Sequence, residues 1–418
     1  MSKVVLDGAV LGLGYFNQQS RTGIYRVAEN LMSGLYRNPA IQLAMTGSQH
    51  LPEIMAYLNA YYPNSGTPVV NKPDELRLAR LENNIVSALG YRSLPQKIIR
   101  EVFTRLRARF KPFLTTDTTA LAAYDIYHSP FLPTPKELSG RSKPKKVITV
   151  HDLIPHLFPA YFGEWNIHIM KQIMACITED TYPICISEST KNDLCEATGV
   201  SPNRVFVVPL AASEDKFYQV RDTEEIEQVL KKYNISIHKR FMLSLATLEP
   251  RKNIERTIRS FLKLIQQQKI DDLNLVLVGT KGWDFETIFG EIKANPVLKD
   301  RIIVTGYVDD KDLAAIYSAA LAFVYPSLYE GFGLPPLEAM QCGTPVISSN
   351  ISSLPEVVED AGILVDPTDE DAIANAMLQL YTDKDLHLAL SKKSLAQAQK
   401  FSWQKFTEQH VQIYGQIS

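Results

Sequence analysis

Residues 240–279, RFMLSLATLEPRKNIERTIRSFLKLIQQQKIDDLNLVLVG, contain an apolar run, a segment with apolar residues at helical spacing, and a second apolar run that ends in glycine. Each apolar run has the length of a β-strand, and the segment between them has the length and period of an α-helix. Two neighbouring strands can run parallel only when a crossover joins them, and a helix is the usual crossover. This stretch therefore predicts a β-α-β unit of a parallel sheet.

The same alternation continues toward the carboxyl terminus. Apolar runs at RIIVTG, LAFVYPS and TPVISS follow or precede helical segments at DFETIFGEIK, DKDLAAIYSAA, LPPLEAMQCG and DEDAIANAMLQLYTD. The segment LPPLEAMQCG opens with prolines and closes on Gly343, which is where helices favour these two residue types. We predict one doubly wound α/β domain over about 211–395.

The amino-terminal half repeats the pattern less regularly. Strand-like runs occur at KVVLDG, IQLAMTG, DIYHSP, KVITVHD, YPICIS and RVFVVP, with helical segments between several of them. The alternation lapses over about 51–119, which we interpret as an insertion. The fold class expected for the whole chain is α/β, with two Rossmann-like parallel-sheet domains, 1–210 and 211–395, facing across a cleft. One more amphipathic helix, within 396–418, is expected to return to the first domain.

Length and composition narrow the possible functions. A chain of 418 residues is too long to fold around one ordinary hydrophobic core, so more than one domain is expected. Its content of 45% hydrophobic and 22% charged residues is that of a globular protein and excludes a disordered one. The net charge of −2 argues against a general affinity for nucleic acid. The four cysteines lack the spacing of a metal site. The amino terminus has no apolar core of signal-peptide type, and no run of about 18 apolar residues occurs, so a cytoplasmic location is expected.

Candidate binding residues follow predicted strands, because parallel α/β sheets bind ligands beyond the carboxyl ends of their strands. In SRTGIYRV, Gly23 directly precedes a helix, whose free N–H groups and dipole suit an anion such as phosphate. An ordinary helix start is the alternative. In TLEPRKN, Arg251 and Lys252 are adjacent cations at a strand-to-helix turn and are well placed for a diphosphate. Their alternative is a solvated charge pair.

The string YEGFGLPPLEAMQCGTPVI, residues 329–347, is the most specific signal in the chain. Glu330 lies in a glycine-flanked loop after the strand LAFVYPS, and Glu338 lies inside the short helix that follows. The loop residues Gly331, Phe332 and Gly333 are candidates for contact with a ligand, because glycine lets the backbone approach closely or adopt positive φ. One carboxylate could reach a sugar, while the other accepts hydrogen bonds from ribose hydroxyls.

Together with GYVDDKDLAAIYSAA, CGTPVISSN and SSLPEV in the same order, these motifs resemble the large fourth family of glycosyltransferases, which have the GT-B fold, retain anomeric configuration and need no metal. The resemblance covers nearly all of 240–370. It implies that Glu330 contacts the donor sugar and that Glu338 binds the donor ribose. It also implies that Lys252 and Arg251 neutralise the diphosphate, and that Gly23 lies under it from the other domain.

The resemblance extends more loosely into the first domain through TGIYRVAENL, VHDLIP and CISEST. His151, at the end of KVITV, matches a family position beside the donor sugar at the catalytic centre, although a histidine at a strand end can also be structural. The chain departs from many family members at Ala246, where they carry an arginine. The diphosphate must then depend on Lys252, Arg251 and backbone donors, since no Asp-x-Asp metal set occurs in a site-like setting.

Several motifs resemble bacterial mannosyltransferases of polysaccharide assembly, which implies GDP-mannose as the donor and a glycan, lipid-linked or protein acceptor. GDP-fucose or a UDP-hexose is the alternative donor, and a non-catalytic nucleotide-sugar scaffold is the alternative function. No cofactor is expected besides the sugar donor. A phosphorylase relative would need a lysine-bound pyridoxal phosphate, for which the sequence gives no signal.

The insertion contains one basic amphipathic segment, YRSLPQKIIREVFTRLRARFKPF, residues 91–113. Its apolar residues Ile98, Ile99, Val102, Phe103, Leu106 and Phe110 recur at helical spacing. Such a helix is typical of a peripheral contact with an anionic membrane surface, which would suit a lipid-linked acceptor on the inner face of the membrane. A helix that covers the first sheet and shows its charged side to water is the alternative.

Overall fold

The computed structural model describes residues 1–17, 20–47, 49–63, 65–87, 89, 94–109, 117–245, 250–279 and 299–418. The helix expected at DFETIFGEIK and the departure at Ala246 lie outside these residues. The chain divides into two compact units. The first contains Met1–Ile186, Thr190–Val208 and Trp403–Ser418, and the second contains Ser187–Ser189 and Pro209–Ser402.

The first unit is built on a parallel sheet whose described strands lie in the order β2-β1-β3-β4-β5-β6. The strand β1 begins the chain and lies inside the sheet, next to the edge strand β2, and its residues Val4, Val5 and Leu6 are fully buried because helices cover the sheet. The strands span Ser2–Asp7 (β1), Ile41–Thr46 (β2), Ile126–Ser129 (β3), Lys145–Val150 (β4), Thr181–Cys185 (β5) and Phe206–Val207 (β6).

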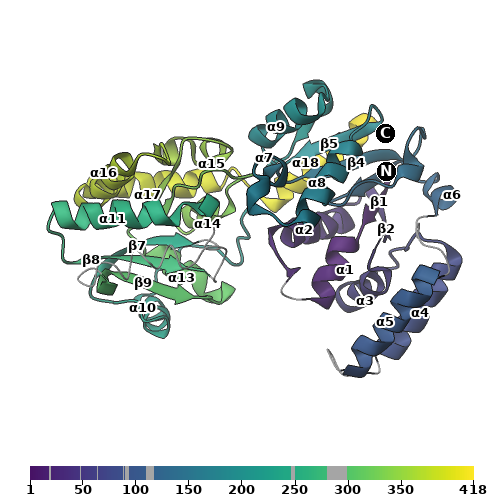
Figure 1. Ribbon diagram of the computed structural model, residues 1–418, viewed down its shortest axis with the longest axis horizontal. Coiled ribbons are helices and arrows are strands. Elements are labelled where there is room, and N and C mark those ends of the chain that lie inside the picture. The colour runs from purple at the N-terminus through teal and green to yellow at the C-terminus, as the bar shows by residue number, and fades with distance from the viewer. Residues whose placement is uncertain are drawn as a thin grey trace. The chain divides into compact units, whose positions relative to one another are not determined.

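Some helices of this unit connect its strands, others belong to the insertion, and one comes from the carboxyl-terminal end of the chain. They span Ala9–Phe16 (α1), Gly23–Arg37 (α2), Leu51–Tyr61 (α3), Pro73–Ser87 (α4), Leu94–Arg109 (α5), Thr118–Leu121 (α6), Ile154–Leu157 (α7), Glu164–Ala175 (α8), Glu188–Thr198 (α9) and Trp403–Ile417 (α18). In the region expected to be an insertion, α3 packs against α1, and α4 packs against both α3 and α5. The helix expected within 91–113 is α5, and α4 and α5 form a hairpin at the periphery of the unit (Figure 1).

The second unit is a parallel sheet in the order β12-β11-β10-β7-β8-β9. Its strands span Arg240–Leu245 (β7), Leu273–Val278 (β8), Ile302–Gly306 (β9), Ala322–Tyr325 (β10), Val346–Ser349 (β11) and Gly362–Val365 (β12). Its described helices span Thr223–Lys232 (α10), Ile254–Gln267 (α11), Asp310–Ala319 (α13), Leu334–Gln341 (α14), Leu354–Val358 (α15), Glu370–Thr382 (α16) and Lys384–Ala398 (α17). The expected β-α-β unit is β7-α11-β8, and the prediction of two α/β parallel-sheet domains is confirmed.

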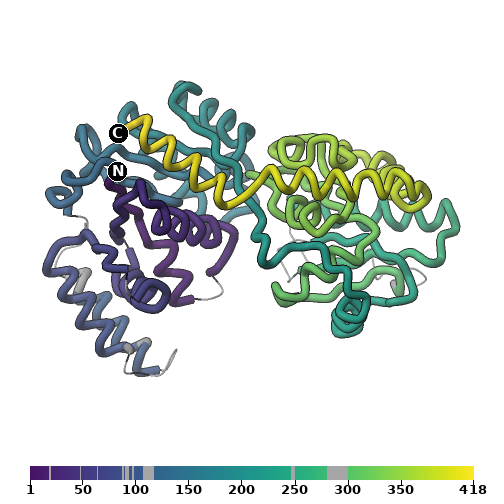
Figure 2. The backbone as a smooth tube through the Cα atoms, turned by 180° about the vertical axis from the view of Figure 1, so that it is seen from behind, coloured from purple at the N-terminus to yellow at the C-terminus, as the bar shows by residue number. Residues whose placement is uncertain are grey.

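The carboxyl-terminal helix α18 belongs to the first unit, whereas α17 belongs to the second. Seen from behind, α18 is the yellow helix that runs across the first unit (Figure 2). It packs against α2, and the hydroxyl of its Tyr414 lies 2.5 Å from Nδ1 of His128 on β3. The helix begins at Trp403, so the first residues of the expected segment 396–418 complete α17 and a short connection instead.

The described residues include no helix that is both long enough and apolar enough to cross a membrane.

Candidate functional site

The best-formed cluster of charged side chains in the second unit lies where β7 and β10 end. The two strands are parallel neighbours, with Phe323 opposite Leu243, so the loops that follow them meet at one edge of the sheet. The backbone N–H of Leu328 donates to the carbonyl oxygen of Arg251 over 2.8 Å and joins the two loops. Arg251, Lys252 and Glu330 are brought together in this way, although 78 residues separate Lys252 from Glu330 in sequence.

One oxygen of the Glu330 carboxylate receives all of that group's described contacts. Oε1 lies 2.6 Å from Nζ of Lys252, 3.0 Å from a guanidinium nitrogen of Arg251, 2.8 Å from the hydroxyl of Tyr325 and 2.6 Å from Oγ of Ser327. Oε2 has no hydrogen-bond partner among the described residues. Because a carboxylate oxygen carries two lone pairs, Oε2 can accept hydrogen bonds from hydroxyl groups of a ligand.

Glu330 is only 8% exposed, yet it stays ionised. Burial alone would raise the pKa of this carboxyl, but the charges of Lys252 and Arg251, with the hydrogen bonds from Lys252 and Ser327, outweigh it and lower the pKa to about 2. The cluster therefore holds one negative and two positive charges across the physiological pH range. The excess positive charge suits an anionic ligand beside the carboxylate.

The turn that presents the two cations is fixed by the next residue. Asn253 has left-handed backbone dihedrals, with φ of 59°, which asparagine tolerates better than most residues. Its side-chain amide donates to the carbonyl oxygens of Pro326 and Pro367 over 2.9 and 2.7 Å. Because Arg251 is 9% exposed and Lys252 contacts Glu330, the two cations are not a solvated surface pair. Their expected contact with a diphosphate stays a prediction.

The loop after Glu330 is held by serine side chains that contact its carbonyl oxygens. Oγ of Ser353 bridges the carbonyl oxygens of Glu330 and Phe332 at 2.9 and 2.7 Å. Gly333 has φ of 120°, and a Cβ atom there would lie 2.9 Å from the side chain of Leu354, so only glycine fits. Phe332 is buried against Phe401. We conclude that Phe332 and Gly333 shape the loop. The loop's carbonyl oxygens accept hydrogen bonds from serine hydroxyls, and the carbonyl oxygen of Gly331 accepts from Ser187 over 2.7 Å.

Glu338 lies on α14, the helix that follows the Glu330 loop. It is 7% exposed, and the hydroxyl of Tyr317 on α13 donates to its Oε2 over 3.3 Å. Burial raises the pKa of Tyr317 well above its usual range, so this hydroxyl remains a donor. The placement on a short helix beside the loop agrees with the sequence reading, and the ribose-binding role stays a prediction.

The two candidates of the first unit lie in different settings: His151 follows a strand as expected, whereas Gly23 follows the helix α1 instead of a strand. Gly23 is the first residue of α2, and among the described residues no side chain caps this helix end, so its N–H groups can bind an anion. His151 follows β4 and its Nε2 lies 2.8 Å from the carbonyl oxygen of Pro130. A carbonyl only accepts, so Nε2 carries the proton and Nδ1 carries the lone pair. Burial lowers the pKa of His151 to about 4, which the hydrogen bond to Pro130 only partly opposes. His151 is therefore a neutral hydrogen-bonding group at pH 7.

Sequence reasoning missed Tyr325, Ser327 and Asn253, which orient the charged groups. Tyr325 ends the buried strand β10 and Ser327 follows two residues later, and both hydroxyls donate to Oε1 of Glu330. A sequence pattern of two polar residues at this spacing, at the end of an apolar run, could have identified Tyr325 and Ser327 as candidates. Asn253 follows the two cations directly, but its need for a left-handed conformation is visible only in the structure.

Comparison with known sequences gives one family and several relatives. Residues 225–401 match the family described as glycosyl transferases group 1. The chain is 35% identical over 290 residues to the O-antigen chain mannosyltransferase B of Escherichia coli, covering 69% of this chain and 74% of that protein. It is also 35% identical over 274 residues to the serotype-specific mannosyltransferase WbdA of Escherichia coli, covering 65% of this chain and 33% of that longer protein.

Solved structures with the same fold extend over the whole chain. The sucrose-phosphate synthase of Thermosynechococcus elongatus superposes with a TM-score of 0.67 at 21% identity, covering 100% of this chain and 99% of that one. Anabaena HepE in complex with UDP and glucose gives 0.65 at 16% identity and covers 100% of both chains. At these identities the likeness establishes the fold alone, and it agrees with the GT-B expectation.

Proposed function

We propose that this chain, which belongs to the group 1 family of glycosyl transferases, transfers mannose from GDP-mannose to a glycan acceptor in bacterial polysaccharide assembly. That the protein is a glycosyltransferase follows from its family and relatives. The choice of mannose is supported by the names of the 35% identical relatives, which are mannosyltransferases of O-antigen synthesis. Retention of configuration and independence from metal ions are proposed on the resemblance of the motifs.

The observation that carries the proposal is the group formed by Glu330, Lys252 and Arg251. Glycosyl transfer passes through an oxocarbenium-like state while negative charge builds on the leaving diphosphate. Lys252 and Arg251 can stabilise that charge from a site that excludes most water, where electrostatic contacts are strong. Oε2 of Glu330 can accept from donor-sugar hydroxyls and orient the ring. In this proposal His151 contributes a neutral hydrogen-bonding group to donor binding. Gly23 contributes the free backbone N–H groups at the start of its helix.

The donor is identified by incubating the purified protein with a panel of nucleotide sugars and measuring its thermal midpoint. A ligand that binds only the folded protein stabilises it by mass action, by about 2.7 kcal/mol at one hundred times its dissociation constant. We expect GDP-mannose to give the largest shift, ahead of GDP-fucose and UDP-hexoses. A larger shift with another donor would replace mannose, and binding without transfer or hydrolysis of any donor would favour the non-catalytic scaffold.

Replacing Glu338 by alanine should raise the dissociation constant of the donor by about tenfold to a hundredfold, since a hydrogen bond to a charged group contributes about 1.5–3 kcal/mol. The rate at saturating donor should change little, because the ribose contact is the same in the ground and transition states. Titration calorimetry with intact donor measures the effect. The control Glu359→Ala, which loses an exposed ion pair with Lys400, should bind donor normally. A fall in kcat with unchanged affinity would contradict the ribose role.

We further propose that the α4–α5 hairpin places the enzyme on the inner face of a membrane, beside a lipid-linked acceptor. The helix α5 points one side inward, where Phe103 is buried and Arg100 pairs with Glu53 of α3 and lies over the ring of Phe16. Its other side presents a row of apolar side chains spaced four residues apart, and α4 adds two more. The exposed set is Leu81, Ile85, Leu94, Ile98, Val102 and Leu106.

This arrangement supports the membrane-surface alternative for the basic helix. A covering helix exposes mainly charged residues, whereas here a row of apolar side chains faces outward. Arg77, Arg80 and Arg105 are exposed on the same hairpin, where Arg77 pairs with Asp74 and Arg105 with Glu101. Apolar side chains gain about 1.5–3 kcal/mol each on leaving water, and each basic residue near an anionic surface contributes about 1 kcal/mol. The two contributions together support peripheral binding to anionic lipid.

The double variant Ile98→Asp with Val102→Asp should lower the affinity for anionic vesicles at least about a hundredfold, because it removes two inserted side chains and adds two repelled charges. Co-sedimentation with vesicles of phosphatidylglycerol and phosphatidylcholine, at low and high salt, measures the change. The control Leu388→Asp alters an equally exposed apolar residue on α17 and should leave binding intact. Absence of wild-type binding at low salt would remove the membrane from the proposal.

A further inference from the structure

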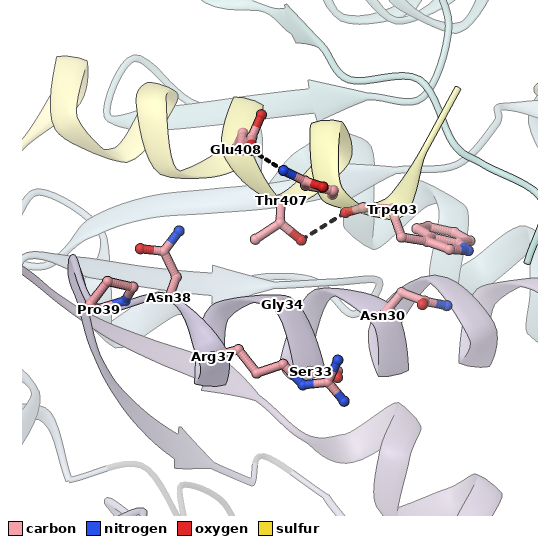
Figure 3. A pocket seen from close by; sticks show the side chains of 10 residues that line it. Asn30, Ser33, Gly34, Arg37, Asn38, Pro39, Trp403, Thr407 and Glu408 are labelled. Carbon is pink, nitrogen blue, oxygen red and sulfur yellow. Dashed lines mark hydrogen bonds between the residues drawn. The ribbon is translucent and has the colours of Figure 1, made fainter. Parts of the chain in front are cut away.

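A groove of about 360 Å³ lies in the first unit between α2 and α18, apart from the residues described above (Figure 3). The groove exists because the two helices approach closely at one point: a Cβ atom on Gly34 would clash with the side chain of Thr407. From this contact the helices leave a hollow with Asn38 toward one end and Trp403 toward the other. Its size lies at the lower end of the range of roughly 300–1,000 Å³ for ligand pockets and suits a mono- or disaccharide.

The walls carry hydrogen-bonding atoms that have no partner among the residues the structure describes. On α2, the amide nitrogen of Asn30 donates to the Arg26 carbonyl over 2.8 Å, which leaves its amide oxygen as an acceptor. On α18, the amide nitrogen of Gln404 donates to Glu408 over 2.9 Å, which leaves the amide oxygen of Gln404 and one carboxylate oxygen of Glu408. Arg37 is exposed in the groove and has no ion-pair partner among the described residues.

The mixture of groups selects one class of ligand. A nucleotide or phosphate would meet Arg37 but also the like charge of Glu408, so the groove offers no net positive charge. A lipid tail would leave the amides and charges of both helices unpaired, which is costly. A sugar ring presents adjacent hydroxyls that both donate and accept, and planar amide, guanidinium and carboxylate groups match such pairs. The indole of Trp403 adds an apolar surface at one end, of the kind on which a ring's C–H face can pack.

We infer that the α2–α18 groove binds a hexose unit of the glycan that the enzyme extends, as a second binding site that takes no part in the transfer itself. This inference rests on the proposed function for the choice of mannose as the hexose. A polymer held at two places dissociates more slowly than one held at the reaction site alone, because the second contact is intramolecular once the first has formed. The groove then favours long acceptors over short ones.

Saturation-transfer NMR measures the binding of linear α-mannotetraose to the Glu330→Gln variant in the absence of a sugar donor. We expect saturable binding, weakened about fivefold or more by Arg37→Ala and by Gln404→Ala, since each loses one hydrogen bond of ordinary strength. The matched control Lys405→Ala removes an exposed charge on α18 that does not line the groove, and it should bind normally. No saturable binding, or equal binding by all variants, would overturn the inference.

A kinetic comparison with the active enzyme separates this site from the reaction site. Arg37→Ala should raise KM for α-mannotetraose about fivefold, while kcat and the KM for α-mannobiose stay unchanged. An equal rise for both acceptors would assign Arg37 to the reaction site and overturn the inference. If no donor supports transfer, the proposed function fails while the binding experiment still decides whether the groove holds a glycan. If transfer occurs but the tetraose does not bind the groove, only the inference fails.

Discussion

Replacing Glu330 by glutamine is expected to lower the rate of transfer at least about a hundredfold, the size of effect seen when one preorganised electrostatic group is removed from an active site. The amide keeps the shape of the side chain but removes the charge that holds Lys252 and Arg251 at 2.6 and 3.0 Å. Both cations then lose their ion pair, and the position of Oε2 no longer presents a charged acceptor to sugar hydroxyls. The loss should fall on kcat, measured with saturating donor and acceptor.

The pH dependence gives a second test of the same group. The folded-state pKa of Glu330 is about 2, below the ordinary value of 4.5 for a glutamate. A depressed carboxyl pKa stabilises the folded protein fully above the unfolded value, and this stabilisation is lost as the pH falls from about 4.5 through 2. Wild-type activity should therefore show no titration of Glu330 between about pH 5 and 8. An acidic limb near pH 6 that disappears in Glu330→Gln would show that the carboxyl is not held as described.

A loss of folding must be separated from a loss of chemistry, because breaking a buried ion pair can destabilise a protein by about 3–5 kcal/mol. Circular dichroism and the thermal midpoint report folding of the variant at the assay temperature. The control Glu370→Gln removes a half-buried carboxylate on α16 that pairs with Arg259 over 2.7 Å, and its activity should stay within about twofold. A folded Glu330→Gln protein with the wild-type rate would refute the assigned role.

Deleting residues 403–418 should abolish the cooperative unfolding of the first unit. The deletion removes α18, whose Phe406, His410, Ile413 and Tyr414 are buried. Each large apolar side chain contributes about 1.5–3 kcal/mol on burial, so their sum is comparable to the total stability of about 5–15 kcal/mol of a typical domain. The deletion also exposes the apolar side of α2 and leaves His128 without the Tyr414 hydroxyl.

Differential scanning calorimetry distinguishes the two units, since each has its own core and its own transition. We expect the deletion to remove or strongly lower one transition and to leave the other nearly unchanged. Removing only residues 416–418 should have little effect, because Gln416 and Ser418 are exposed. Two unchanged transitions in the long deletion would mean that α18 does not complete the first core.

A segment of the fold could be predicted where its own apolar residues recur with the period of a strand or of a helix. The unit β7-α11-β8 was predictable because its apolar period changes from that of a strand to that of a helix and back within 39 residues. Within 51–119 only α5 had such a pattern, and α3 and α4 were not expected. The helix α3 packs against α1, and the order of such a segment comes from tertiary contacts more than from its own propensity.

The candidate site divides in the same way. The motif of residues 329–347 identified Glu330 and Glu338 because glycines, prolines and carboxylates at fixed spacing form a specific string. It could not indicate that four groups converge on one oxygen of Glu330 while the other oxygen has no described partner. Which oxygen is occupied depends on side-chain directions at the ends of two strands, and a sequence pattern does not contain those directions.

The sequence by itself determined the family, the two parallel α/β sheets and the residue types at the candidate site, because periodicity and motifs are local properties of the chain. Only the tertiary structure decided that Arg251 and Lys252 meet Glu330, since parallel pairing of β7 and β10 joins loops that are 78 residues apart. It also decided that α5 exposes Ile98 and Val102 while burying Phe103. An amphipathic pattern shows that a helix has two faces, but the partners available in three dimensions determine which face is covered.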